Sequence, residues 1–182
     1  MSENTDHTIL KLCRSEQSAN YGFRLLVDKY NQRVYWHIRR MVIDHDDADD
    51  LVQDTFLKVW KNLNGFRADS GLFTWIYRIA TNETLTFLKR KKRRFMLPLV
   101  DYEQKLEHSL TDDNYFSGNE IQLKLQKAIL KLPEKQRLVF QMKYFDDLKY
   151  KDISEILGTS VGALKASYHL AVKKIEESVT TD

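Results

Sequence analysis

The fold of this chain is decided by the stretch Tyr150-Lys-Asp-Ile-Ser-Glu-Ile-Leu-Gly158-Thr-Ser160-Val-Gly-Ala-Leu-Lys-Ala-Ser-Tyr-His-Leu-Ala-Val-Lys-Lys-Ile175. Its first residues carry apolar side chains at helical spacing, and Gly158 follows where the chain must turn with a positive φ. Ser160 can then cap a second helix, because its hydroxyl accepts a hydrogen bond from a free backbone N–H. Two short helices joined by a tight turn with a glycine predict a helix-turn-helix DNA-binding unit.

The second helix of this unit separates two faces at about 100° per residue. We expect its apolar residues to face the core, namely Val161, Leu164, Tyr168, Ala171, Val172 and Ile175. On the other side, small residues let the helix approach a DNA major groove, and polar side chains reach bases or phosphates. The candidate DNA contacts are Ser160, Lys165, Ala166, Ser167, His169, Leu170 and Lys173. An ordinary amphipathic helix is the alternative.

Composition indicates a globular cytoplasmic protein. The chain has 182 residues, of which 42% are hydrophobic and 30% are charged, so a disordered chain is excluded. No apolar run approaches the roughly 18 residues that a membrane span requires. The amino terminus lacks the basic and apolar regions of a secretion signal, and Cys13 is the only cysteine. We therefore expect neither membrane insertion nor a disulfide.

The spacing of apolar residues predicts an all-α fold. Only six glycines and two prolines occur, and nearly every periodic segment fits a helix better than a strand. Helices are expected at residues 8–18, 21–42, 46–63, 71–91, 119–131, 134–145, 149–157 and 160–178. Residues 95–118 contain Pro98 and five acidic residues against one lysine. We interpret them as a flexible acidic linker between two small helical domains, residues 1–94 and 119–182.

The predicted helix at 46–63 carries an acidic face opposite its apolar one. The polar residues on this face are Asp47, Asp49, Asp50, Gln53 and Asp54. Carboxylates in a first turn stabilise the helix dipole, which explains only the earliest of them. The remainder favours a docking surface for a basic partner helix. A metal site through His45 and Asp49 is an alternative, but the sequence identifies no further ligands for it.

A glycine-bounded loop at residues 65–71 leads into a helix rich in aromatic residues and then into six consecutive basic residues, 89–94. Aromatic side chains can receive unstacked bases while basic neighbours hold the phosphates. We expect Trp75 and Ile79 to lie in the core. Four other residues are harder to explain as core residues, namely Phe66, Arg67, Arg78 and Asn82.

With both halves in view, the chain resembles a bacterial sigma factor of the extracytoplasmic-function class, within the sigma-70-like family of RNA polymerase subunits. The first similarity is the segment 23–30. Residues 47–60 resemble the core-polymerase-binding helix of the family. Phe66 with residues 73–82 resembles its segment for recognising and melting the −10 promoter element. Residues 132–140, with the helix-turn-helix, resemble its −35-reading domain.

The resemblance implies a role for each candidate residue. The acidic face would dock on core RNA polymerase, and the second helix of the helix-turn-helix would face the −35 element. A flipped base and its flanking phosphates would be held by Phe66, Arg67, Asp69, Ser70, Arg78, Asn82, Lys89 and Arg90. The linker would run through the polymerase channels. An anti-sigma protein is a further expected partner. Family members often have arginines where this chain has Ser167, Leu170 and Val172, so fewer arginine–guanine contacts are expected here.

We therefore expect a non-catalytic initiation subunit with no cofactor and no small-molecule substrate. The sequence has no glycine loop for phosphate, no nucleophile–base pair and no convincing metal cage. The flexible linker should make the free chain bind promoter DNA weakly, and docking on polymerase should raise the effective concentration of the second contact. The alternatives are a helix-turn-helix regulator, a polymerase-binding adaptor that does not melt DNA, and a metal-dependent hydrolase using His37 and His45.

Overall fold

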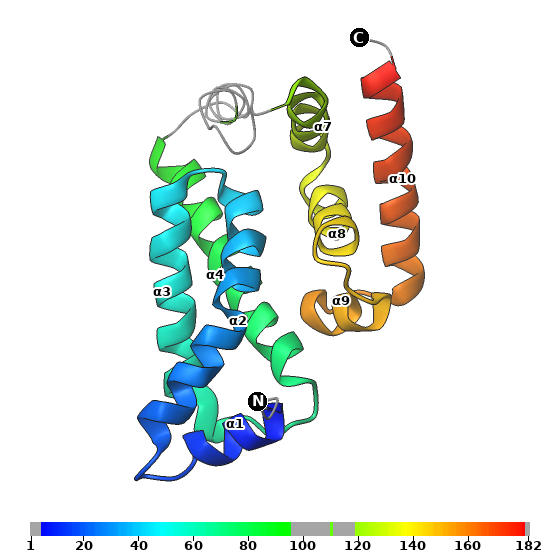
Figure 1. Cartoon of the computed structure of the whole chain (residues 1–182). Coiled ribbons are helices and arrows are strands. Elements are labelled where there is room, and N and C mark those ends of the chain that lie inside the picture. Colours follow the sequence, from blue (N-terminus) through cyan, green and yellow to red (C-terminus); the bar gives the residue numbers. More distant parts are fainter. Residues whose placement is uncertain (1–4, 96–109, 111–118, 181–182) are drawn as a thin grey trace.

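The computed structural model describes residues 5–95, 110 and 119–180, and the regular elements within these ranges are all helices. The N-terminal half contains α1 (Asp6–Cys13), α2 (Ala19–Val42), α3 (His45–Asn62), the short 3-10 turn η1 (Leu63–Gly65) and α4 (Leu72–Phe95). The C-terminal half contains α7 (Glu120–Leu130), α8 (Glu134–Tyr144), α9 (Tyr150–Leu157) and α10 (Val161–Thr180). Figure 1 shows the two groups of helices side by side. The all-α prediction is confirmed, and no described helix is long and apolar enough to cross a membrane.

The predicted helix bounds differ from the structure mainly at two ends. The first helix ends at Cys13 rather than at residue 18, because the chain turns there to bring α2 across α1. This crossing is close: a Cβ on Gly22 would lie 2.6 Å from the backbone nitrogen of Cys13. The helix predicted for 71–91 continues to Phe95, so the basic block is helical. Apart from Phe95 and Leu110, the predicted linker lies outside the described residues.

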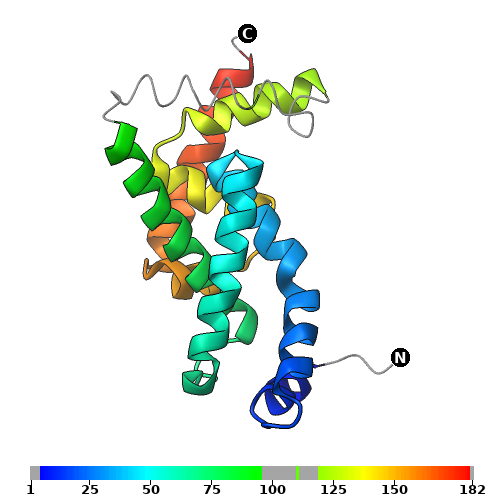
Figure 2. The same ribbon diagram turned by 90° about the vertical axis from the view of Figure 1, so that its left-hand side faces the viewer.

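The N-terminal half packs α1, α2, α3 and α4 around one apolar core, and Figure 2 shows α3 alongside α4. The apolar face expected opposite the acidic one is confirmed, since the apolar residues on that side, from α3 into η1, are all buried: Leu51, Val52, Phe56, Val59 and Leu63. Asp44 caps this helix, because its carboxylate accepts a hydrogen bond of 2.9 Å from the Asp47 N–H. Cys13 also lies in this core, and burial raises the pKa of its thiol.

The helix-turn-helix forms as its sequence predicts. Gly158 ends α9 with a φ of 63°, in the left-handed region where a side chain is strained. Ser160 precedes α10, and its hydroxyl oxygen lies 3.4 Å from the N–H of Ala163. On α10 three of the expected core residues are buried: Leu164, Ala171 and Ile175. The expectation for Val161 is wrong, because this residue lies in the first turn, beyond the edge of the core, and is 37% exposed.

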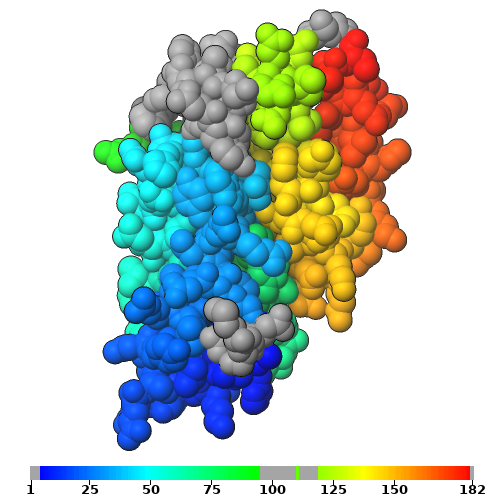
Figure 3. All heavy atoms as spheres, viewed as in Figure 1, coloured from blue at the N-terminus to red at the C-terminus, as the bar shows by residue number. Residues whose placement is uncertain are grey.

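The two halves also pack against each other, which no local pattern in the sequence indicates. Apolar residues of the C-terminal half, among them Leu138, Ile153 and Leu164, belong to the same core cluster as residues of α2, α3 and α4. Helix α9 lies against α4, and α8 lies against α2. In the space-filling view of Figure 3, the atoms of α2 and α8 meet along the middle of the molecule. This packing places the candidate surfaces relative to one another.

Candidate nucleic-acid interface

The acidic face of α3 is open to solvent over most of its length. Four of its predicted residues are exposed: Asp49, Asp50, Gln53 and Asp54. Asp47 is half-buried instead, because its carboxylate forms an ion pair with Lys91 in the basic block of α4. The same face continues into Leu57, which is 56% exposed. Sequence reasoning did not assign Leu57, although its position seven residues after Asp50 places it on this stripe.

His45 does not complete a metal site. Its Nδ1 lies 2.8 Å from the Tyr35 hydroxyl, and its Nε2 lies 3.5 Å from Asp49. Both ring nitrogens therefore have protein partners. Among the residues that the structure describes, no group of three or more His, Cys, Asp or Glu side chains could hold a metal ion.

The loop from residue 66 to residue 71 is anchored at its first residue. The expectation that Phe66 lies outside the core is wrong: its side chain is 6% exposed, and its ring centroid lies 4.9 Å from that of Trp75. The Phe66 carbonyl oxygen accepts a hydrogen bond of 2.7 Å from Arg14, a residue that sequence reasoning did not assign. The glycine-bounded context suggested an exposed aromatic ring, whereas packing against α4 buries it.

Beyond this anchor the loop is exposed. Arg67, Ala68 and Asp69 are all open to solvent, and Ser70 is half-buried. Ala68 has a φ of 61°, a conformation that costs a non-glycine residue about 1–2 kcal/mol. Arg67 and Asp69, on either side of this residue, are therefore accessible to an external ligand.

One stripe of α4 continues from this loop. Arg78, Asn82 and Lys89 occur at spacings of four and seven residues, which places them on one side of the helix. Asn82 and Lys89 are exposed, and so is Arg90. Arg78 is half-buried, and its Nε is buried without a hydrogen-bond partner among the described residues. The stripe presents an amide and two cations, a set that suits a phosphate backbone.

The predicted reading face of α10 is open to solvent. Its exposed residues are Ser160, Lys165, Ala166, His169, Leu170 and Lys173. Ser167 is half-buried and lines a cavity of about 240 Å³ between the two halves. Lys89 of α4 lines the same cavity. The structure thus brings one candidate −10 contact and one candidate −35 contact to the lining of a single cavity.

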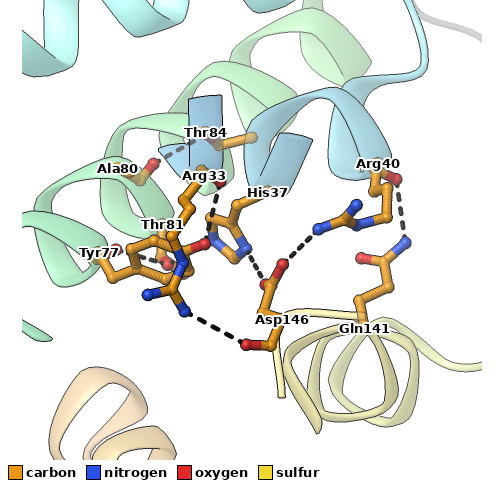
Figure 4. A network of polar contacts seen from close by, with 9 residues as sticks. All are labelled: Arg33, His37, Arg40, Tyr77, Ala80, Thr81, Thr84, Gln141 and Asp146. Carbon is orange, nitrogen blue, oxygen red and sulfur yellow. Dashed lines mark hydrogen bonds and ion pairs between the residues drawn. The ribbon is translucent and has the colours of Figure 1, made fainter. Parts of the chain in front are cut away.

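A buried polar network also joins the two halves (Figure 4). Asp146 lies in the turn between α8 and α9, and its side chain is 2% exposed. One carboxylate oxygen lies 2.9 Å from Nδ1 of His37, which must donate because a carboxylate only accepts. The other oxygen pairs with the Arg40 guanidinium. Both of these partners come from α2.

Further hydrogen bonds fix the partners of Asp146. Nε2 of His37 lies 2.9 Å from the Thr81 hydroxyl of α4. The Gln141 side chain donates to the Arg40 carbonyl oxygen over 3.0 Å, which adds a further bond between the halves. Tyr77 donates to the Arg33 carbonyl oxygen, and burial, followed by the charge of Asp146, raises the pKa of the Tyr77 hydroxyl. Sequence reasoning considered His37 only as a hydrolase residue and did not identify Asp146.

Comparisons with known proteins agree with this arrangement. Residues 26–94 match the family model of sigma-70 region 2, and residues 122–175 match that of sigma-70 region 4. The ECF RNA polymerase sigma factor SigW of Bacillus subtilis is 32% identical over 169 residues, which cover 88% of this chain and 89% of that protein. The RNA polymerase sigma-H factor of Pseudomonas aeruginosa is 30% identical over 174 residues, covering 91% of this chain and 90% of that protein.

Two solved structures share the fold. One is the sigma factor RpoE of Bartonella quintana in complex with the anti-sigma factor NepR, with a TM-score of 0.67 at 21% identity, covering 88% of this chain and 98% of that one. The other is CnrH in complex with the cytosolic domain of CnrY, with a TM-score of 0.69 at 22% identity, covering 97% and 98%. The fold and the paired matches define a sigma-70-type transcription initiation factor. The chain belongs to the extracytoplasmic-function (ECF) family of RNA polymerase sigma factors.

Proposed function

We propose that this chain is an alternative sigma factor that binds core RNA polymerase and reads the −35 and −10 elements of a promoter. It would also help to separate the two DNA strands at the −10 element. The observation that carries the proposal is the order of the two sigma-70 matches along one chain, with an exposed candidate surface in each half. Nucleotide addition would belong to the polymerase. The chain itself would act in the cytoplasm as a non-catalytic subunit without a cofactor.

The acidic face of α3 is the proposed docking surface for core polymerase. Asp49, Asp50 and Asp54 offer negative charge without an intramolecular ion pair to a lysine or arginine in the described residues, and Leu57 offers apolar area beside them. A basic helix of the partner fits this combination, because charge guides association while buried apolar area holds the complex. Asp47 is already paired with Lys91, so we assign it a smaller share of the docking energy.

The loop beyond Phe66 and the exposed stripe of α4 are the proposed −10 surface. Arg67, Asp69 and Ser70 would hold a base flipped from the non-template strand, and Asn82 and Lys89 would hold its flanking phosphates. Flipping a base costs a few kcal/mol, so the loop must be fixed before the base arrives. The contacts of Phe66 with Arg14 and Trp75 support this order, because they anchor the loop in the free chain.

The exposed face of α10 is the proposed −35 reader. Ala166 is small enough to let the helix approach the major groove, while Lys165 and Lys173 can reach phosphates on either side. His169 can hydrogen-bond a base edge, and Leu170 can contact a thymine methyl group. Since arginine is absent from this face, we expect a −35 preference that depends on shape and apolar contact more than on guanine pairs.

We also propose an anti-sigma protein as a regulatory partner. The sigma factor RpoE, which shares this fold, was solved with the anti-sigma factor NepR, and CnrH, which also shares it, was solved with the cytosolic domain of CnrY. Several candidate surfaces of this chain are open to solvent and combine charge with exposed apolar residues such as Leu57 and Leu170, which suits a protein partner.

Run-off transcription tests the function directly. Bacterial core polymerase would be mixed with fragmented genomic DNA, with and without this chain. Discrete transcripts that appear only with the chain are expected, and the sequences upstream of their starts would supply both promoter elements. Tight binding to core without any transcript would favour the adaptor alternative. Tight binding to duplex DNA without core would favour the helix-turn-helix regulator.

A further inference from the structure

We propose that Asp146 is a latch that holds the free chain in a closed conformer, and that this latch must release when the chain reads a promoter. The closed conformer is the arrangement in which α8 and α9 lie against α2 and α4. The need for release rests on the proposed function, whereas the latch itself rests on the contacts of Asp146. Three steps support the proposal: the spacing of the two readers, the burial of Asp146, and the packing around it.

The closed conformer leaves no room for DNA between the two readers. Lys89 and Ser167, which belong to different candidate readers, line one cavity of about 240 Å³. A duplex, whose major groove alone is about 12 Å wide, cannot enter this space while the halves are packed together. The two halves must separate before both elements can be bound.

The Asp146 carboxylate is buried away from solvent, and its hydrogen-bond partners come from the opposite half. Its side chain is 2% exposed, and it is satisfied by His37 and Arg40, which lie more than a hundred residues earlier in the chain. A buried carboxylate is stable only while its partners remain in place. When the halves separate, water can replace all of these partners at once. The network therefore specifies the closed arrangement but does not prevent its opening.

The apolar packing between the halves is interrupted on one side of α4. A cavity of about 240 Å³ lies between α4 and the C-terminal half, and Leu85, Leu138 and Leu157 are among its lining residues. Side chains that line this cavity make fewer dispersion contacts than those of a packed core. The polar network therefore adds to the apolar contacts that the halves share, and loss of Asp146 should shift the balance between closed and open chains.

Asp147 supplies a matched control in the neighbouring position. Its side chain is 96% exposed, and its only ion pair in the described residues is with Lys143, 3.7 Å away on its own side of the interface. Its φ of 50° is tolerated by asparagine as well as by aspartate. Asp147→Asn therefore removes the same charge as Asp146→Asn, one residue away, without touching a contact between the halves.

The separation of the halves can be measured on the full chain. Arg24→Cys on α2 and Glu176→Cys on α10, both exposed, would carry spin or fluorescent labels in a Cys13→Ala background. The labelled parent should show one short distance, which lengthens when core polymerase is added. We expect Asp146→Asn to raise the ratio of open to closed molecules at least tenfold without core. Asp147→Asn should leave the ratio unchanged, and circular dichroism should show equal helix content in all variants.

A second variant and a second measurement distinguish release of the latch from a folding defect. His37→Gln removes the same contact from the other half, so its effect and that of Asp146→Asn should be less than additive in a double-mutant cycle. Only open molecules are expected to bind core polymerase, so a large closed population lowers the apparent affinity of the chain. Asp146→Asn should therefore bind core polymerase more tightly than the parent. While the open form remains the minor one, the gain in affinity should equal the rise in the open fraction. Weaker core binding together with an unchanged distance would overturn the latch.

Failure of the latch and failure of the proposed function give different results. If the free parent already shows the long distance, or if Asp146→Asn leaves the short one unchanged, the latch is wrong even when run-off transcripts appear. If the distances respond as expected but no transcript appears with core polymerase, the latch holds and the assignment as a promoter-reading subunit fails.

Discussion

Arg14 donates a hydrogen bond to the carbonyl oxygen of Phe66, with 2.7 Å between the two atoms. Arg14 lies in the turn between α1 and α2, fifty-two residues before Phe66. The contact ties the start of the candidate −10 loop to the N-terminal helices, while Trp75 holds the Phe66 ring from α4. Held at this end, the exposed residues Arg67 and Asp69 have fewer conformations to lose when a base binds.

Replacing Arg14 should therefore weaken binding of the flipped base, although Arg14 itself would not contact that base. We expect Arg14→Met to reduce the affinity of the polymerase-bound chain for single-stranded −10 DNA roughly fivefold, or about 1 kcal/mol, which is the usual worth of one hydrogen bond. Fluorescence anisotropy with a labelled non-template oligonucleotide would measure this. Arg24→Met, another exposed arginine, is the control and should have no effect. An equal loss on a duplex carrying only the −35 element would contradict a local role.

Phe66 and Arg67 are adjacent residues with opposite expected phenotypes. Phe66→Ala should lower the free energy of unfolding by about 3–5 kcal/mol, because it empties a buried aromatic site. Arg67→Ala should change that free energy by less than about 0.5 kcal/mol, since Arg67 is exposed, yet it should weaken −10 binding. Urea unfolding and oligonucleotide binding would be measured for both variants. Strong loss of DNA binding by Phe66→Leu at nearly unchanged stability would instead restore Phe66 as a base contact.

Local signals made most of the fold predictable. The face of α3 follows from apolar spacing, and Gly158 follows from the chemistry of a helix end, because both depend on residues within one or two turns. The prediction that Phe66 lies outside the core is wrong, because its burial depends on Trp75 in another element. Asp146 offered no signal at all: its partner His37 is 109 residues away, and nothing near Asp146 in the chain distinguishes it from the exposed Asp147.

The acidic face of α3 predicts how core polymerase binding responds to charge. Asp50→Lys should weaken core binding at least thirtyfold, or about 2 kcal/mol, because it places like charges together in the proposed interface. Glu176→Lys makes the same change at an exposed position on α10 and should leave core affinity within twofold. Binding would be measured at two salt concentrations, since the effect should shrink as salt screens the charges. Equal losses for the two variants would indicate a general effect of net charge.

Lys165 and His169 should separate affinity from sequence preference at the −35 element. Lys165→Ala removes a proposed phosphate contact, so holoenzyme should bind all −35 sequences more weakly, and the slope of log affinity against log salt should become less steep by about 1. His169→Ala should instead reduce discrimination at one base pair by about 1–3 kcal/mol and leave the salt slope nearly unchanged.

The two responses are distinguishable because salt acts on phosphate contacts, whereas base substitution acts on contacts in the groove. A panel of −35 duplexes, each with one base pair changed and titrated at two salt concentrations, would measure both. Lys124→Ala is the matched control, because Lys124 is an exposed lysine on α7, in the same half of the chain but outside the helix-turn-helix. If Lys124→Ala lowered the salt slope as much as Lys165→Ala, then α10 would not be the helix that lies in the groove.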